Sequence, residues 1–309
     1  MGGLFCEGNQ LEKTMKDQYT TSRLSLRKLS FDDAEFILEL VNMPQWIQFI
    51  GDRKIRNVED ANKYIQKISE NPNIKYWVVK IADAQISIGV ITFIKREYLK
   101  HYDIGFAFLE RYGKKGFAYE AADVVMDDLN QTHSEILATT IKENVNSIRL
   151  LEKLGLRFER EIQVDEEQLL VYSLQTDKGK IDKLTQDFFG LFTNTHQRQP
   201  DFKTIETICL AEMIIIKKSA EGETVYNLPS FVEPRKKILS DGTLTEFEEW
   251  ETQGETKIAG NLAQRFSTYT KSGYMKGSFF QKSGTKIFQF VKTKEGWKIS
   301  SVIWEDDVK

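Results

Sequence analysis

The sequence has few of the residues that build metal sites, disulfide frameworks and hydrolase triads. It holds two cysteines, Cys6 and Cys209, which lie far apart, and three histidines, which are also scattered. These spacings do not suit a disulfide framework or a zinc site, and so few histidines make a Ser/His triad hard to assemble. A reducing, cytoplasmic compartment fits the two cysteines best.

Long apolar runs and an excess of charge of one sign are also missing. No run comes near the about 18 apolar residues that span a bilayer. The 43 basic and 46 acidic side chains give a formal net charge of −3. Residues 1–14 lack a basic segment followed by an apolar one, so we do not expect a secretory signal there. The sequence therefore predicts partners that are neither nucleic acids nor membranes.

What the sequence does have is length, since 309 residues exceed the usual size of one domain. The polar stretch 175–180 carries a glycine and separates two regions of different pattern. We predict a disordered tail at 1–19, a first domain at 20–178 and a second domain at 179–309.

Hydrophobic periodicity predicts a mixed order of strands and helices in the first domain. The expected strands are 23–27, 76–81, 87–93, 103–109, 136–140, 158–162 and 169–174. The expected helices lie around 36–41, after Asp32 and Asp33 and ended by Pro44, and at 61–68, 118–129 and 145–154. This order predicts an α/β unit.

The second domain begins with one predicted helix at 181–192 and is otherwise rich in strands. The expected strands are 207–217, 245–256, 257–272, 274–282, 286–293 and 297–304, with a stretch interrupted by glycine and proline up to Pro234. This pattern predicts an α+β unit with a long antiparallel sheet.

The segment from Gly113 to Ala118, GKKGFA, joins an apolar strand to an amphipathic helix. Such a junction points several backbone N–H groups at one place, and the N-terminus of the helix adds a positive field there. Glycines let the backbone approach a pyrophosphate closely. We interpret this loop as an anion site, although many ordinary turns between a strand and a helix contain two glycines.

A second motif follows the next strand, in the order Asn144-Val145-Asn146-Ser147 and onward to Gly155 and Phe158. Asn144 or Asn146 is expected to cap a helix that Gly155 ends. The spacing resembles the N-x-x-S-x-x-L-x-E-K-x-G-F pattern of the GNAT superfamily of N-acetyltransferases. The preceding loop resembles their Q/R-x-x-G-x-G/A motif.

The stretch Thr21 to Arg27 followed by Asp33-Ala34 looks like the opening of the Rim-type subgroup, which includes ribosomal-protein N-terminal acetyltransferases. The resemblance covers roughly residues 20–175. One position departs from it, because the family's Gln or Arg falls on Gly113, with Arg111 two residues earlier. Weaker or rearranged cofactor binding is one reading of this departure.

The resemblance implies a GNAT fold with a mixed, mostly antiparallel sheet that binds acetyl-CoA as co-substrate. The strand before the loop would splay from its neighbour and pair with the cofactor, with an oxyanion-binding N–H near Phe108 or Leu109. The other implied cofactor contacts are Arg111, Gly113, Lys114, Lys115, Gly116, Phe117, Ala118 and Asn144.

For catalysis, the resemblance implies that Ser147 protonates the thiolate that leaves. Asp103 is our candidate to take or relay the proton of the amine, with an ion pair to a neighbour such as His101, or solvent exposure, as the equal alternative. The acceptor pocket is expected at the loops 43–56 and 95–100, where Trp46, Phe49 and Tyr98 could line it. The basic side chains of these loops are better explained as solvated surface, although an acidic acceptor is conceivable.

The second domain ends in Gly296-Trp297-Lys298-Ile299 and Trp304, and resembles the SnoaL and nuclear-transport-factor-like cone fold. Members of that fold use the cone as an enzyme pocket, a ligand site or half of a dimer interface, so a homodimer through this domain is one expectation.

Three functions remain open from the sequence. The first is an enzyme that moves an acetyl group from acetyl-CoA to a primary amine, of a protein N-terminus or a small molecule, by direct attack. The second is a GNAT-fold binding protein or dimeric scaffold without turnover, suggested by Gly113. The third places the chemistry in the cone domain.

Overall fold

The computed structural model describes residues 15–307, so Cys6 and most of the predicted tail lie outside the described residues. The chain divides into two compact units after Thr176, the second beginning at Asp177. The sequence placed this boundary two residues later.

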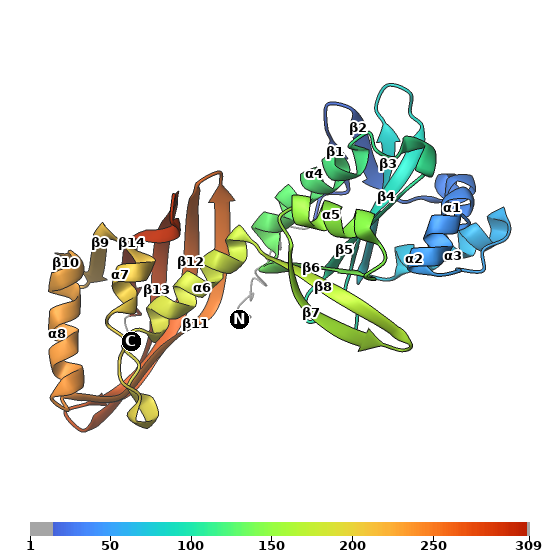
Figure 1. Ribbon diagram of the computed structural model, residues 1–309. Coiled ribbons are helices and arrows are strands. Elements are labelled where there is room, and N and C mark those ends of the chain that lie inside the picture. Colours follow the sequence, from blue (N-terminus) through green and yellow to red (C-terminus); the bar gives the residue numbers. More distant parts are fainter. Residues whose placement is uncertain (1–14, 308–309) are drawn as a thin grey trace, which may run out of the picture. The chain divides into compact units, whose positions relative to one another are not determined.

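The first unit (Figure 1) contains one eight-stranded sheet in the order β1-β2-β3-β4-β5-β6-β8-β7. Only β5 and β6 run parallel to each other. The strands are β1 (Gln18–Thr20), β2 (Leu24–Lys28), β3 (Ile74–Ile81), β4 (Ser87–Ile94), β5 (Asp103–Phe108), β6 (Glu135–Thr140), β7 (Arg157–Val164) and β8 (Glu167–Gln175). The helices are α1 (Ala34–Val41), α2 (Pro44–Ile50), α3 (Val58–Glu70), α4 (Phe117–Thr132) and α5 (Val145–Lys153), with short 3₁₀ turns η1 (Phe31–Asp33) and η2 (Glu110–Tyr112).

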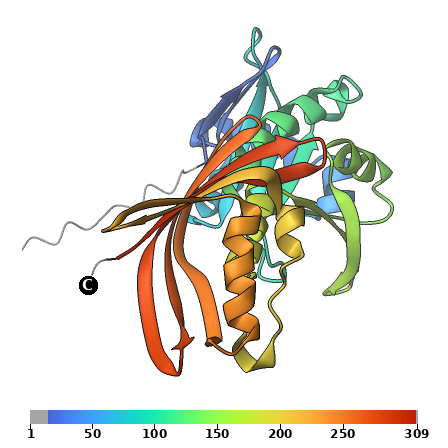
Figure 2. The ribbon, with the colours of Figure 1, turned by 90° about the vertical axis from the view of Figure 1, so that its left-hand side faces the viewer.

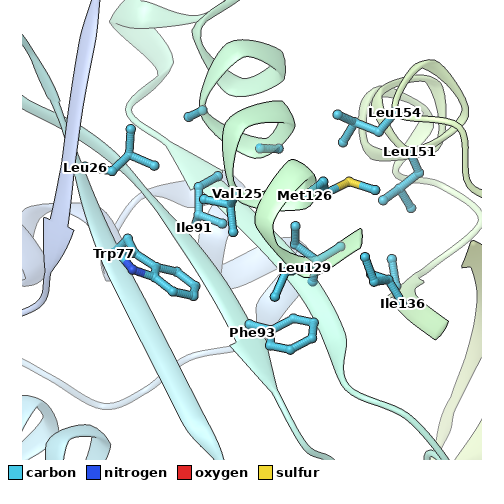
Figure 3. Packing of buried hydrophobic residues seen from close by; sticks show 14 of the residues in the cluster. Leu26, Trp77, Ile91, Phe93, Val125, Met126, Leu129, Ile136, Leu151 and Leu154 are labelled. Atoms are coloured by element: carbon cyan, nitrogen blue, oxygen red, sulfur yellow. The ribbon is translucent and has the colours of Figure 1, made fainter. Parts of the chain in front are cut away.

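Helices cover both faces of this sheet. On one face, Val125 and Leu129 of α4 lie against Ile91 and Phe93 of the sheet, with Leu151 of α5 beside them (Figure 3). On the opposite face, α1, α2 and α3 enclose a separate apolar core against β3 and β4. The mixed, mostly antiparallel sheet predicted for this region is confirmed.

The N-terminal edge of the sheet differs from the prediction. Residues 1–19 were expected to lack structure, but Gln18–Thr20 forms β1 and pairs with β2. Tyr19 is buried in the core, and its hydroxyl donates to a carboxylate oxygen of Asp128 at 3.0 Å. One aromatic anchor is enough to order a strand too short to show periodicity.

The second unit has a six-stranded sheet in the order β10-β9-β14-β13-β12-β11, and Figure 2 shows its long strands curving. The strands are β9 (Cys209–Ser219), β10 (Gly222–Tyr226), β11 (Leu244–Ala259), β12 (Leu262–Met275), β13 (Ser278–Thr293) and β14 (Gly296–Asp306). The helices are α6 (Asp177–Gly190), α7 (Thr204–Ile208) and α8 (Leu228–Ser240), with the turn η3 (Thr195–Gln197). A core rich in phenylalanine fills the space between the helices and the sheet.

Helix α8 was missed in the sequence because proline and glycine marked the region as a loop. Its start is well capped, since the Asn227 side chain accepts the Ser230 N–H at 3.0 Å and Pro229 stands in the first turn. Pro234 lies inside the helix, while the burial of Phe231 attaches it to the core. Tertiary packing therefore overrides the helix-breaking tendency of proline.

Three strand boundaries also differ from the prediction, one of them because the turn between β12 and β13 lies at residues 276–277, inside the strand expected at 274–282. The turn between β11 and β12 lies at Gly260, so residues 257–259 belong to the first of these strands. Residues 274–282 and 286–293 were expected as two strands, but β13 runs through Ser283 and Gly284, and both pair with β12. Small residues were read as a break where the hydrogen-bond ladder continues.

Among residues 15–307, no helix is long and apolar enough to cross a membrane. The same residues contain no cluster of three His, Cys, Asp or Glu side chains that could hold a metal ion.

Candidate active site

The sheet of the first unit opens between its two parallel strands. β5 pairs with β4 along its whole length, from Asp103 to Phe108. Within the described residues, its pairing with β6 is a single register pair, Asp103 with Leu137. The two strands therefore separate beyond Asp103, and the edge of β5 that faces β6 is left without a strand partner.

The direction of the amide groups along β5 shows which of them face this gap. Leu109 donates its backbone N–H to the Ile88 carbonyl of β4 at 2.9 Å, and the Tyr102 carbonyl accepts a hydrogen bond from β6 at 2.9 Å. Amide groups alternate in direction along a strand. The N–H groups of Phe106 and Phe108 must then point toward β6, into the gap.

Two helices begin beyond the open end of the gap. Because β5 and β6 are parallel, their carboxyl ends lie at the same edge, and the chain continues from them into α4 and α5 respectively. In α4 the first intrahelical bond is donated by Glu120 to the Gly116 carbonyl. The N–H groups of Phe117, Ala118 and Tyr119 therefore have no acceptor within the helix, which makes this end a cradle for an anion.

Each of the two glycines of the loop, Gly113 and Gly116, is favoured at its position for a different structural reason. Gly116 caps α4 with φ 80°, a left-handed conformation in which a side chain is strained. A Cβ on Gly113 would lie 3.0 Å from the Glu110 carbonyl oxygen, so the backbone there is tightly folded. Lys114 is also left-handed, with φ 59°. The loop is held in a shape that a longer residue at 113 would disturb.

Arg23, directly before β2, ties the loop to the body of the unit. Its guanidinium donates to the Lys115 carbonyl at 3.2 Å and pairs with Glu120 at 2.7 Å, and its Cζ lies 4.7 Å from the centre of the Phe117 ring. Lys115 extends over the ring of Tyr112. The loop is therefore fixed from both sides and carries positive charge.

Two predicted cofactor contacts are placed differently from the prediction. The Leu109 N–H is already bonded to β4, and the side chain is buried, so this amide cannot serve as an oxyanion donor. Arg111 pairs with Glu39 of α1 and does not point along the loop in place of a residue at 113. The Phe108 N–H faces the gap, and its contact with the cofactor stays a prediction.

The start of α5 carries the second motif. Asn144 caps the helix through its side-chain oxygen, which accepts the Ser147 N–H at 3.1 Å, and Gly155 follows the helix with φ 93°. This confirms the predicted cap and stop. The cap uses only the oxygen of Asn144, and within the described residues its amide nitrogen has no hydrogen-bond partner. Ser147 is partly exposed, and its hydroxyl has no hydrogen-bond partner within residues 15–307.

Asp103 lies at the closed end of the gap and is 2% exposed. One carboxylate oxygen accepts from Arg96 Nε at 2.8 Å and from Thr139 Oγ1 at 2.9 Å. The other is buried and has no partner in the described part of the chain. Burial raises the pKa of Asp103, and the neighbouring Arg96 opposes that rise. His101 pairs instead with Glu135.

This geometry argues against direct proton transfer from an acceptor to Asp103, because neither carboxylate oxygen is open. It also corrects the interpretation of Arg96 as solvated surface, since the guanidinium pairs with a buried carboxylate. Trp46, which was expected to line the acceptor pocket, is buried in the apolar core that α1, α2 and α3 form.

Sequence reasoning missed Arg23, Glu120 and Thr139. Arg23 lies directly before β2 and Thr139 lies in β6, nothing local distinguishes either residue, and their partners lie far away in the sequence. Only the tertiary contact of the segment before β2 with α4, and the contact between β5 and β6, could have identified them.

The assembled site suits an extended ligand with an anionic group at one end. The anion would lie on the amides before α4, near Lys114 and Lys115, and the rest would run along the free edge of β5. A carbonyl oxygen opposite Phe106 or Phe108 would accept a backbone N–H, and negative charge that develops on it would be stabilised.

Comparisons with known proteins find relatives of the first unit. The family model described as an acetyltransferase (GNAT) domain matches residues 23–157. The uncharacterized N-acetyltransferase YnaD of Bacillus subtilis is 31% identical over 144 residues, which cover 45% of this chain and 82% of that protein. The uncharacterized N-acetyltransferase p20 of Bacillus licheniformis is 28% identical over 148 residues, with the same shares of the two chains.

Among solved structures, an acetyltransferase (GNAT family) from Bacillus anthracis is 27% identical. The match covers 51% of this chain and 98% of that chain, with a TM-score of 0.44.

Proposed function

Because the chain belongs to the GNAT family of acetyltransferases, we propose that its first unit moves the acetyl group of acetyl-CoA to a primary amine by direct attack in a ternary complex. The observation that carries this proposal is the single register pair between β5 and β6. A sheet that opens beside two helix N-termini offers a line of backbone donors that ends at an anion site.

In this proposal the pyrophosphate of acetyl-CoA lies on the loop, against the amides of Gly116, Phe117 and Ala118. Lys114 and Lys115 add positive charge, and the Asn144 amide nitrogen supplies a contact from α5. The pantetheine arm then runs along β5 in place of a strand. The thioester carbonyl accepts the N–H of Phe106 or Phe108, which stabilises the tetrahedral oxyanion.

The chemical step needs one bond to form and one to break. The amine nitrogen attacks the thioester carbonyl carbon, the carbon–sulfur bond breaks, and the sulfur leaves as the thiolate of CoA. Ser147 is proposed to give this thiolate its proton, since its hydroxyl has no other partner within the described residues. The proton that the amine loses passes to water, and Ser147 regains from water the proton that it gave to the thiolate.

A finer assignment within the family is the Rim-type subgroup, on the sequence of residues 21–27 and 33–34. Arg23 of that stretch is the residue that holds the loop through the Lys115 carbonyl. The acceptor would then be the amine of a protein N-terminus or of a small molecule.

For the second unit we propose the SnoaL-like cone. Support comes from helices packed on one face of a curved six-stranded sheet whose only parallel pair is β9 with β14. A cavity of about 840 Å³ lies between α6, the 198–204 segment and β11. Its lining includes Glu249 and Glu251 but no histidine, and both glutamates are engaged by Lys286 and Arg265. We therefore assign no catalysis to it.

A homodimer through this unit would use the outer face of its sheet. One apolar row crosses five adjacent strands there, in cross-strand register. The row consists of Val225, Ile216, Ile303, Ile287 and Phe266. Ile303→Lys should shift the protein to monomer in sedimentation if this row is the interface. A cytoplasmic location, and the absence of nucleic acid and membrane partners, remain predictions from the sequence.

The decisive experiment is calorimetry of the full chain with acetyl-CoA, followed by a screen of amines, peptides and antibiotics for thiol release. Binding with thiol release is the expected result. The absence of binding would overturn the enzyme and cofactor proposals together. Binding without thiol release for any acceptor would favour the scaffold, which the departure at Gly113 suggested.

A further inference from the structure

The face of β5 turned away from α4 carries a polar group at the closed end of the gap. Asp103, Gly105 and Ala107 alternate with the residues that pack against α4, so they share the face covered by α1 to α3. There Asp103 joins β5 to β6 through the Thr139 hydroxyl and holds the Arg96 guanidinium.

Asp103 is committed to orienting Arg96. Its side chain is 3% exposed, and the oxygen that bonds to Arg96 also accepts the Thr139 hydroxyl. A carboxylate buried in this way fixes one edge of a guanidinium and leaves it little rotational freedom. Asp103 therefore holds the positive charge of Arg96 in a fixed position.

The other edge of Arg96 is partly exposed. Its Nε is used by Asp103, and the hydroxyl of Tyr98, whose ring centre lies 6.0 Å from the guanidinium carbon, accepts a hydrogen bond from the same guanidinium. The side chain is still 34% exposed, and a guanidinium has five N–H donors, more than these two partners use. A guanidinium held in this way keeps donors that can bind a carboxylate.

The surroundings favour a negative ligand. Burial raises the pKa of the Tyr76 hydroxyl, and the positive charges of Arg53 and Arg96 oppose that rise. Both guanidinium groups therefore act on the same place, where Tyr64 and Tyr76 meet hydroxyl to hydroxyl at 3.2 Å. Lys95 nearby is already occupied by the carbonyls of Leu99 and Lys100, so the unused donors belong to Arg96.

We propose that Arg96 binds a carboxylate of the acetyl acceptor, so that the acceptor is an amine of amino-acid or short-peptide size that also carries a carboxylate. This inference rests on the proposed acetyl transfer. A strand rises about 3.3 Å per residue, which puts the Phe106 amide about 10 Å along β5 from Asp103. An acceptor of that size can reach the thioester with its amine while its carboxylate stays on Arg96.

The test measures ligand binding to the full chain without CoA, so that it does not depend on turnover. The probes are the N-acetyl derivatives of alanine, phenylalanine, glutamate and lysine, each compared by calorimetry or NMR titration with its C-terminal amide. We expect at least one acid to bind about tenfold or more tightly than its amide. Equal affinity in every pair, or no binding of any acid, would overturn the proposal.

Variants assign the preference to Arg96. Arg96→Gln combined with Asp103→Asn removes both charges without leaving a buried carboxylate unpaired, and should reduce the preference to less than about twofold. Arg96→Lys should keep part of it, and Arg160→Ala, an exposed arginine on β7, should keep all of it. A preference that survives the double variant would overturn the role of Arg96. If the wild-type protein does not bind acetyl-CoA, the proposed function is contradicted instead. The failure of the proposed function can therefore be told apart from the failure of the role of Arg96.

Discussion

The two sheets of this protein differ in how completely their neighbouring strands pair. In the second unit, β12 pairs with β13 at every residue from Leu262 to Met275, so the ladder is complete. In the first unit, β5 and β6 share one register pair and then diverge. Backbone groups without a partner are costly when buried, and native sheets rarely leave them so. The gap is therefore the place where we propose that acetyl-CoA completes the sheet.

Charged groups follow the same division. In the second unit, Lys286 is buried and pairs with Glu249 at 2.5 Å, and Arg265 is shared between Glu251 and Asp182. These charges are satisfied within the unit. In the first unit, the loop lysines and the exposed part of the Arg96 guanidinium are turned outward. Internal pairing indicates a structural role, and unpaired donors at an open edge indicate a ligand.

The largest effect is expected from Gly116→Val. A β-branched residue at φ 80° is strained, and its side chain would stand where the backbone must approach a pyrophosphate. Acetyl-CoA affinity measured by calorimetry should fall by about a thousandfold or more. The matched control is Gly277→Val, at φ 78° in the turn between β12 and β13, which carries the same backbone strain away from the site. Equal losses of affinity in both variants would remove the loop from the cofactor site.

The next effect tests whether the buried charges of the second unit are structural. Lys286→Ala leaves Glu249 buried without its partner, so the free energy of unfolding should fall by about 3–5 kcal/mol. Combining Lys286→Met with Glu249→Leu should return it close to the wild-type value in a urea titration. Burial lowers the pKa of Lys286, with Glu249 opposing the change. If the double variant is as unstable as the single one, the pair has a role beyond compensating its own charge.

A smaller effect is expected at the helix beyond β6. Ser147→Ala should lower turnover by about a hundredfold while acetyl-CoA affinity stays unchanged, because the hydroxyl acts only on the leaving thiolate. Asn146→Ala, in the same turn and exposed, should leave both quantities unchanged. Turnover that is unaltered in Ser147→Ala would exclude Ser147 from the mechanism.

The comparison also explains what could be read from the sequence. The loop 113–118 and the cap at Asn144 are local signals, because the conformation of each residue there depends on a few neighbours in the sequence. They therefore predicted the turn before α4 and the start of α5 correctly, while the binding of an anion at that turn stays a prediction. The completeness of a ladder is not local. Nothing in 103–109 distinguishes a strand paired on both sides from one paired on one side, so the gap was implied by the family and not by the residues.

Long-range pairs account for the errors at the site. Arg96 and Asp103 were identified separately, one as surface charge and one as a base, because their contact depends on how the segment after β4 folds back. Arg111 stood beside the motif and was assigned to the cofactor, while its partner Glu39 lies in α1. Arg23 holds the loop from more than ninety residues away. Charged side chains find partners through tertiary structure, which spacing in the sequence does not encode.

The smallest effect is the most direct test of the contrast between the sheets. Without ligand, the amide hydrogens of Phe106 and Phe108 face the gap and should exchange faster than that of Phe288, which lies within the complete ladder of β13. Saturating acetyl-CoA should slow exchange at Phe106 and Phe108 by about tenfold or more and leave Phe288 unchanged. Hydrogen exchange read by NMR resolves the three amides. Protection at Phe106 and Phe108 that is already equal to Phe288 without acetyl-CoA would mean that the edge is not open in solution, and the contrast between the two sheets would no longer locate the site.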